Sequence, residues 1–120
     1  MKNILLVEDD TMHCALVQDI LEMEKYCVRF ARDGEEALLI LESESFDLVL
    51  TDINMFKMNG IELLERIREM KKPQKVIAMT AELQTRSGKT FEEVGFDGFI
   101  QKPFKINQFR EYVKSFISDD

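Results

Sequence analysis

The sequence of 120 residues predicts an α/β fold, in which helices cover both faces of a doubly wound, five-stranded parallel sheet. Short runs of aliphatic and β-branched residues alternate five times with segments whose apolar residues recur every three or four positions. The length is typical of one domain, and the 45% of apolar residues suffices for a buried core. We therefore expect residues 1–120 to form a single domain.

Five segments are predicted as strands. Three of them are continuous apolar runs, which are typical of strands buried on both faces: Asn3–Val7, Asp47–Thr51 and Lys75–Thr80. Cys27–Ala31 alternates between apolar and polar residues, so we expect it at an edge of the sheet. Gly98–Gln101 is a short fifth strand.

Helices are predicted in the intervals between these strands and after the last one. Asp33 is a candidate cap for the second helix, with Glu36 placed to reach back to it. The apolar stripes that predict four of the helices are Met12, Ala15, Leu16, Ile20 and Met23; Ala37, Leu38 and Leu41; Ile61, Leu64 and Ile67; and Ile106, Phe109, Val113, Phe116 and Ile117.

The remaining helix, from about Leu83 to Val94, has the weakest pattern. Its apolar stripe is thin, and Gly88 in its middle costs about 1 kcal/mol relative to alanine. We expect it to be the least stable helix of the domain.

An alternating chain of this kind commonly takes the strand order 2-1-3-4-5 with right-handed crossovers. The order reverses between the first and third strands. Ligands of such sheets bind in the crevice beyond the carboxyl ends of the strands at this switch point.

Composition excludes several classes of function. A net charge of −7 disfavours binding to nucleic-acid phosphates. The longest apolar run, Ala37–Leu41, is far shorter than the roughly 20 residues that cross a bilayer, so no membrane insertion is expected. The two cysteines have no metal-ligand spacing and, with no leader pattern ahead of the first strand, favour a cytoplasmic location.

Polar residues follow the predicted strands at the edge where ligands bind. Glu8, Asp9 and Asp10 follow the first strand, Asp52 the third, Thr80 ends the fourth, and Lys102 follows the fifth; these are the candidate site residues. Taken singly, Asp10 and Thr80 fit helix caps better, and Lys102 fits a surface position. Their joint occurrence at four strand ends favours a common site.

The chemistry of such a site follows from its charges. Carboxylates about 5 Å apart repel by about 3 kcal/mol even at an effective dielectric of 20, so three of them together are costly unless a cation or shared protons offset the repulsion. Mg²⁺ (or Mn²⁺) is the predicted ion because its ligands are carboxylates, waters and phosphate oxygens. Lys102 and Thr80 are candidate phosphate ligands, and Asp52 is a candidate nucleophile that forms an acyl phosphate.

The sequence closely resembles a two-component response-regulator receiver domain, of the chemotaxis type. The resemblance covers residues 2 to 118 and implies a flavodoxin-like fold. Its motifs are Ile4–Asp10, Leu48–Met55, Met58–Gly60, Met79–Ala81 and Lys102–Phe104.

The resemblance implies roles for individual residues. Asp52 would take a phosphoryl group from a phosphohistidine of a sensor kinase or phosphotransfer protein. The metal would be held by Glu8, Asp9, Asp52 and the backbone carbonyl of Asn54, and the phosphoryl group would be contacted by Thr80 and Lys102. Phe99 would turn inward when Thr80 moves, which changes the surface formed by the fourth helix, fifth strand and fifth helix. The Lys102–Pro103 bond would be cis.

Two positions depart from the family pattern. Phe56 stands where the family usually has proline, so we expect a more mobile loop, and we favour packing over a partner contact for its ring. Phe99 replaces the commoner tyrosine and cannot donate a hydrogen bond. His13, the only histidine, is expected at the rim of the pocket in a structural or modulatory role.

The favoured function is therefore a phosphorylation switch that catalyses only its own phosphotransfer and dephosphorylation, and acts on a downstream protein effector. One alternative is an aspartate-nucleophile phosphatase, which typically carries a second aspartate two residues after the nucleophile, where this chain has Asn54. Another is a binding module that never takes phosphate. A monomer and a phosphorylation-dependent dimer both remain open.

Overall fold

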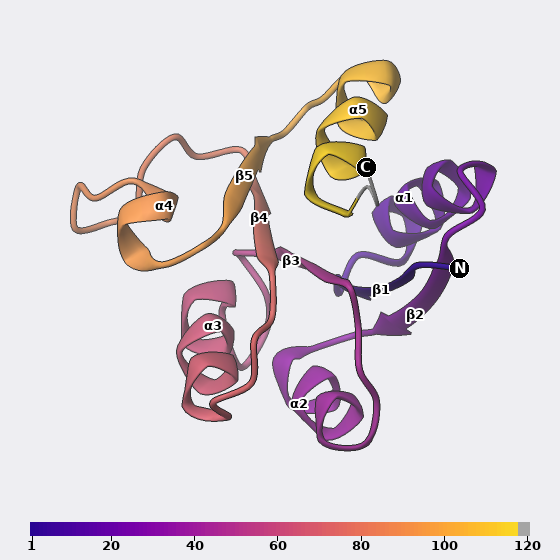
Figure 1. Cartoon of the computed structure of the whole chain (residues 1–120). Coiled ribbons are helices and arrows are strands. Elements are labelled where there is room, and N and C mark those ends of the chain that lie inside the picture. The colour runs from indigo at the N-terminus through magenta and orange to yellow at the C-terminus, as the bar shows by residue number, and fades with distance from the viewer. Residues whose placement is uncertain (118–120) are drawn as a thin grey trace.

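Strands and helices alternate along the chain in the computed structural model, which describes residues 1–117 (Figure 1). The strands are β1 (Asn3–Val7), β2 (Cys27–Ala31), β3 (Leu48–Asp52), β4 (Val76–Thr80) and β5 (Gly98–Gln101). The helices are α1 (Thr11–Met23), α2 (Gly34–Ser43), α3 (Gly60–Glu69), α4 (Phe91–Val94) and α5 (Ile106–Ile117). The predicted alternation is confirmed.

The five strands form one parallel sheet in the order β2-β1-β3-β4-β5, as predicted. The register aligns Val7 with Thr51 and Thr80 with Gln101. The carboxyl ends of β1, β3, β4 and β5 therefore lie along the same edge of the sheet. Cys27–Ala31 pairs only with β1 and is an edge strand, also as predicted.

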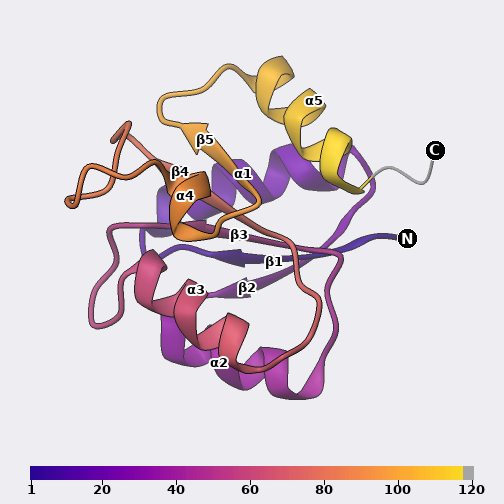
Figure 2. The same ribbon diagram turned by 60° about the vertical axis from the view of Figure 1, so that its left-hand side comes forward.

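Helices cover the sheet on both faces (Figure 2). α1 and α5 pack on one face, where Val17 and Phe109 contact the aliphatic residues of the central strands. α2, α3 and α4 pack on the other, where Leu63 and Phe91 are fully buried. The strand residues alternate between these two cores, because successive side chains point to opposite faces. Within residues 1–117, no helix has the length and apolarity that a bilayer span requires.

The first three helices begin at polar caps. The side chains of Asp10, Asp33 and Asn59 each accept a hydrogen bond from a backbone N–H group in the first turn that follows. Asp10 thus has the capping role that its position alone favoured.

The apolar stripe predicted for α1 was wrong. Met12 is 83% exposed, and Leu16 and Met23 also face solvent. The buried face instead carries Cys14, Val17, Ile20 and Leu21, so of the predicted stripe only Ile20 is buried. Both faces of this helix are apolar, and periodicity alone does not say which of them meets the sheet.

The predicted fourth helix was too long, because α4 begins only at Phe91. Gly88 has a φ of +86°, a left-handed conformation that interrupts a right-handed helix. The helix starts at a capping box in which Thr90 accepts from the Glu93 N–H and the Glu93 carboxylate accepts from the Thr90 N–H. The segment 81–90 is therefore a loop, and it borders a groove of about 740 Å³ beside α3.

Candidate functional site

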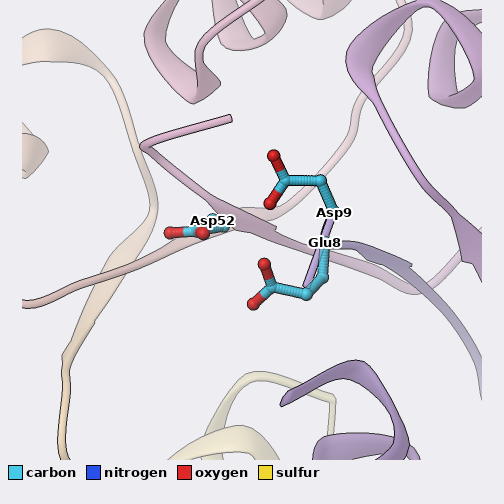
Figure 3. A group of neighbouring side chains, drawn as sticks. All are labelled: Glu8, Asp9 and Asp52. Atoms are coloured by element: carbon cyan, nitrogen blue, oxygen red, sulfur yellow. The ribbon is translucent and has the colours of Figure 1, made fainter. Parts of the chain in front are cut away.

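Three carboxyl groups meet at the carboxyl edge of the sheet (Figure 3). Glu8 and Asp9 follow β1, and Asp52 is the last residue of the neighbouring strand β3. One oxygen of each group lies within 4.8 Å of one oxygen of the others. Glu8 is 1% exposed and Asp52 8% exposed, whereas Asp9 is open to solvent.

The position of Asp52 depends on close packing beneath it. Its Oδ1 accepts a hydrogen bond of 2.8 Å from the Ile53 N–H. α3 starts directly against this strand end, since a Cβ atom on Gly60 would lie 2.5 Å from the Asp52 carbonyl oxygen. Only glycine fits this contact, so Gly60 allows α3 to approach the site.

Lys102 supplies the positive charge of the site. Its Nζ atom lies 3.3 Å from Glu8 Oε1 and 3.4 Å from Asp52 Oδ1, between the two buried carboxylates. The preceding backbone is anchored to β4, because the Lys102 N–H donates to the Thr80 carbonyl at 2.8 Å. The Lys102–Pro103 bond is cis, as predicted.

The two buried carboxyl groups have opposite pKa shifts. Burial, reinforced by the negative charge of Glu8, raises the pKa of Asp52 to about 6, although Lys102 opposes this. Burial also acts to raise the pKa of Glu8, but the hydrogen bond with His13 and the charge of Lys102 outweigh it and lower that pKa to about 2. As the pH rises, the proton that this pair retains longest is therefore the one on Asp52.

His13 lies beside the site in the first turn of α1, at the rim position that the sequence predicted. Its Nδ1 is 2.5 Å from Glu8 Oε1, the same oxygen that faces Lys102. Its ring also meets Phe104 edge-on, with centroids 6.0 Å apart. His13 thus links the metal-ligand candidate Glu8 to the loop after β5.

Thr80 and Asn54 are joined through a residue that the sequence reasoning did not single out. The Thr80 hydroxyl accepts a hydrogen bond of 3.2 Å from the Glu82 N–H, and the Asn54 amide donates to Glu82 Oε1 at 3.1 Å. Thr80 is thus near the site, on the strand next to Asp52, with its hydroxyl engaged by the following loop. The only signal in the sequence was a hydroxyl residue two positions before Glu82, which is a common turn pattern.

The side chain of Phe56 does not pack against the protein as the sequence predicted. Its ring is 75% exposed, so the predicted packing of this side chain was wrong. Its backbone N–H donates a hydrogen bond of 3.0 Å to Asp9 Oδ2, a bond that proline cannot form. The greater mobility expected of this loop stays a prediction.

Phe99 lies on β5 next to the strand that ends in Thr80. Its ring stacks on Phe91 of α4 with centroids 5.0 Å apart and an interplanar angle of 25°. Its N–H donates to the Tyr112 hydroxyl of α5 at 2.9 Å. Phe99 therefore connects β5 with both α4 and α5.

The arrangement supports phosphate chemistry at a divalent cation. Three carboxylates with one lysine leave the site rich in negative charge, and oxygen ligands of this kind suit Mg²⁺. Asp52 offers a carboxylate nucleophile within reach of Lys102.

The chain is similar to one protein family over most of its length. The family model described as the response regulator receiver domain matches residues 4–114. The transcriptional regulatory protein CpxR of Escherichia coli (strain K12) is 40% identical over 104 residues, which cover 87% of this chain and 44% of CpxR. The alkaline phosphatase synthesis transcriptional regulatory protein PhoP of Bacillus subtilis (strain 168) is 34% identical, with 97% of this chain and 48% of PhoP covered. The chain thus spans about half the length of these curated relatives.

Solved structures resemble the fold closely. Response regulator protein TrrA from Thermotoga maritima, in complex with Mg²⁺-BeF, has a TM-score of 0.86 and 35% identity, and the match covers 97% of this chain and 99% of TrrA. A CheY-like response regulator receiver domain protein from Methanospirillum hungatei JF-1 has a TM-score of 0.89 and 33% identity, with 99% of this chain and 95% of that protein covered.

Proposed function

The chain belongs to the response regulator receiver domain family, and from this premise we propose that Asp52 is its phosphoacceptor. The observation that carries the proposal is the place of the Asp52 carboxylate, which lies next to the acidic residues Glu8 and Asp9 and 3.4 Å from the ammonium group of Lys102. The donor is a phosphohistidine of a sensor histidine kinase or of a phosphotransfer protein.

The transfer exchanges one bond to phosphorus for another. A carboxylate oxygen of Asp52 attacks the phosphorus atom, and the bond from phosphorus to the imidazole nitrogen of the donor breaks, with its electron pair staying on that nitrogen. Lys102 leaves its two carboxylate partners in part and pairs with the new phosphoryl oxygens. Asp52 reacts as the anion, so its raised pKa limits the reaction in acid.

Mg²⁺, or Mn²⁺, fits the residues present. Glu8, Asp9, Asp52 and the backbone carbonyl of Asn54 would hold the ion, since all four offer oxygen atoms. When bound, it neutralises negative charge on the phosphoryl oxygens and on the carboxylates. The structure of TrrA with Mg²⁺-BeF supports this proposal for a related chain.

Phosphorylation then acts as a switch. It adds a charge of about −1.5 to −2 next to Thr80. The Thr80 hydroxyl, which accepts from the Glu82 N–H, turns to donate to a phosphoryl oxygen, and Phe99 leaves its stacked position on Phe91. The output surface comprises β5, α5, the short α4 and the loop 81–90 that replaces the first turns of the predicted helix.

The proposed setting follows from the family. The partners are a sensor kinase or phosphotransfer protein and a downstream protein effector, in the cytoplasm. The chain itself carries out phosphotransfer to Asp52 and its reversal by water, with no turnover of other substrates. The excess of acidic residues argues against direct contact with nucleic acid.

The test uses a small phosphodonor. Wild type and Asp52→Ala are incubated with acetyl phosphate and Mg²⁺, and their intact masses are measured. A phosphate adduct on wild type that is absent from the variant is the expected result. Steady release of phosphate from unrelated monoesters would favour a phosphatase instead, and a wild type without adduct would favour a module that never takes phosphate.

A further inference from the structure

The loop after β3 is connected to the loop after β1 by a main-chain group. The Phe56 N–H donates to Asp9 Oδ2 at 3.0 Å, which joins two segments 47 residues apart in the sequence. The same loop is tied to the loop after β4, because the Asn54 amide donates a hydrogen bond of 3.1 Å to Glu82 Oε1. The first bond engages Asp9, a member of the carboxylate cluster, and the second starts two residues after Asp52.

Each acid of the cluster accepts a hydrogen bond or forms an ion pair, and Glu8 and Asp52 share Lys102. Glu8 faces His13 and Lys102, and Asp52 faces Lys102 and the Ile53 N–H. Asp9 is the exposed member, and the Phe56 amide engages one of its two oxygens.

The Phe56 ring takes no part in this contact. It is 75% exposed, so the interaction with Asp9 depends on the backbone and on the presence of an N–H group. Nineteen of the common side chains leave that group in place, whereas proline removes it. Substitutions at this position can therefore test the effect of the backbone N–H separately from the effect of the ring.

We propose that the Phe56 amide is a positioning group for the cation site, which orients the Asp9 carboxylate and keeps the loop that carries Asn54 next to it. The inference rests on the proposed Mg²⁺ site. With Oδ2 bound by the amide, Oδ1 remains for the ion, and the carboxylate loses less rotational freedom when the ion binds. The same bond fixes the distance between Asp9 and the segment that contains the Asn54 carbonyl.

Magnesium titration of three proteins tests the proposal. Phe56→Ala removes the ring and keeps the N–H, and Phe56→Pro removes the N–H. Isothermal titration calorimetry with MgCl₂ should give wild type and Phe56→Ala the same affinity within about twofold. Phe56→Pro should bind about tenfold more weakly, which corresponds to the loss of one hydrogen bond to a charged group. Equal affinities of the proline and alanine variants would overturn the proposal.

A second measurement does not depend on how well the proline variant folds. Amide hydrogen exchange at Phe56 is followed by NMR in wild type and in Asp9→Ala, without added metal. Loss of the carboxylate should speed exchange at this amide about tenfold or more, with amides of the distant strand β2 unchanged. Unchanged exchange at Phe56 would overturn the proposal.

The two proposals fail in different ways. A wild type that binds no Mg²⁺ would contradict the proposed function, whatever the exchange rate at Phe56. A wild type that binds Mg²⁺ while Phe56→Pro binds it equally well would leave the phosphoacceptor role intact and contradict only the role of the amide.

Discussion

At the scale of single residues, the stability of the folded chain depends on pH through the two buried carboxyl groups of Asp52 and Glu8. The folded chain binds the Asp52 proton more tightly than the unfolded chain does, because its pKa rises from the ordinary 3.8 to about 6. Stability from this group is therefore complete below about pH 3.8 and is lost as the pH rises through about 6. Glu8 acts in the opposite sense, since its lowered pKa contributes stability above pH 4.5 that is lost as the pH falls through about 2.

Replacing Asp52 by asparagine removes a buried charge and should stabilise the metal-free protein. We expect Asp52→Asn to raise the free energy of unfolding at pH 7 by about 1–3 kcal/mol, the order implied by a pKa shift of this size. Urea unfolding at several pH values measures it. Between pH 4 and 6 the stability of wild type should fall relative to that of the variant. Parallel curves would contradict the assigned pKa of Asp52.

At the scale of elements, the segment predicted as the fourth helix differs from the structure, because residues 81–90 form a loop and only the short α4 is helical. Gly88 weakened the helix predicted from Leu83 to Val94, and its left-handed φ shows why the helix is absent there. Gly88 showed in the sequence where the helical pattern is interrupted. The start of α4 after its cap Thr90 could not be read in the same way, because a capping-box sequence can also lie inside a loop.

The change in the free energy of unfolding caused by Gly88→Ala has opposite signs for a loop and for a continuous helix in this segment. At a φ of +86°, Gly88→Ala strains the backbone and should lower the free energy of unfolding by about 1 kcal/mol. In a continuous helix the same change would raise it by about as much. Chemical denaturation measures the difference, with Arg86→Ala in the same loop as a control expected to stay within about 0.5 kcal/mol. A more stable Gly88→Ala would show that the segment is helical.

The first helix shows a second limit of sequence reasoning. Met12 and Leu16 form an apolar stripe at helical spacing, and so do Cys14 and Val17. Which stripe is buried depends on how α1, which is capped by Asp10, is rotated about its own axis against the sheet. Such a geometric choice is not encoded in residue spacing.

For the molecule as a whole, the strand order and the clustering of the site were both predictable. Alternating segments specify a parallel sheet, and its topology brings Glu8, Asp52 and Lys102 together, as observed. The contacts made by backbone groups were not predictable, and the Phe56 amide is the main example. Side-chain type says nothing about which N–H faces a carboxylate.

Magnesium should stabilise the whole domain if the cluster binds it. At a free concentration ten times the dissociation constant, the free energy of unfolding should rise by about 1.4 kcal/mol. Thermal or urea unfolding with MgCl₂, against NaCl of equal ionic strength, measures the effect. Glu8→Gln should abolish it, whereas Glu65→Gln, at an exposed acid of α3 outside the cluster, should retain it. A gain that persists in Glu8→Gln would place the ion elsewhere.

The hydrogen bond from the Phe99 N–H to the Tyr112 hydroxyl has a practical consequence. The chain contains no tryptophan and two tyrosines, so its tyrosine fluorescence comes from Tyr26 and Tyr112 without a tryptophan signal over it. A rearrangement of β5 that breaks this hydrogen bond would change the environment of the Tyr112 phenol, and a Tyr26→Phe protein would isolate that emission. The domain would thus carry its own optical reporter of the proposed switch, with no dye attached.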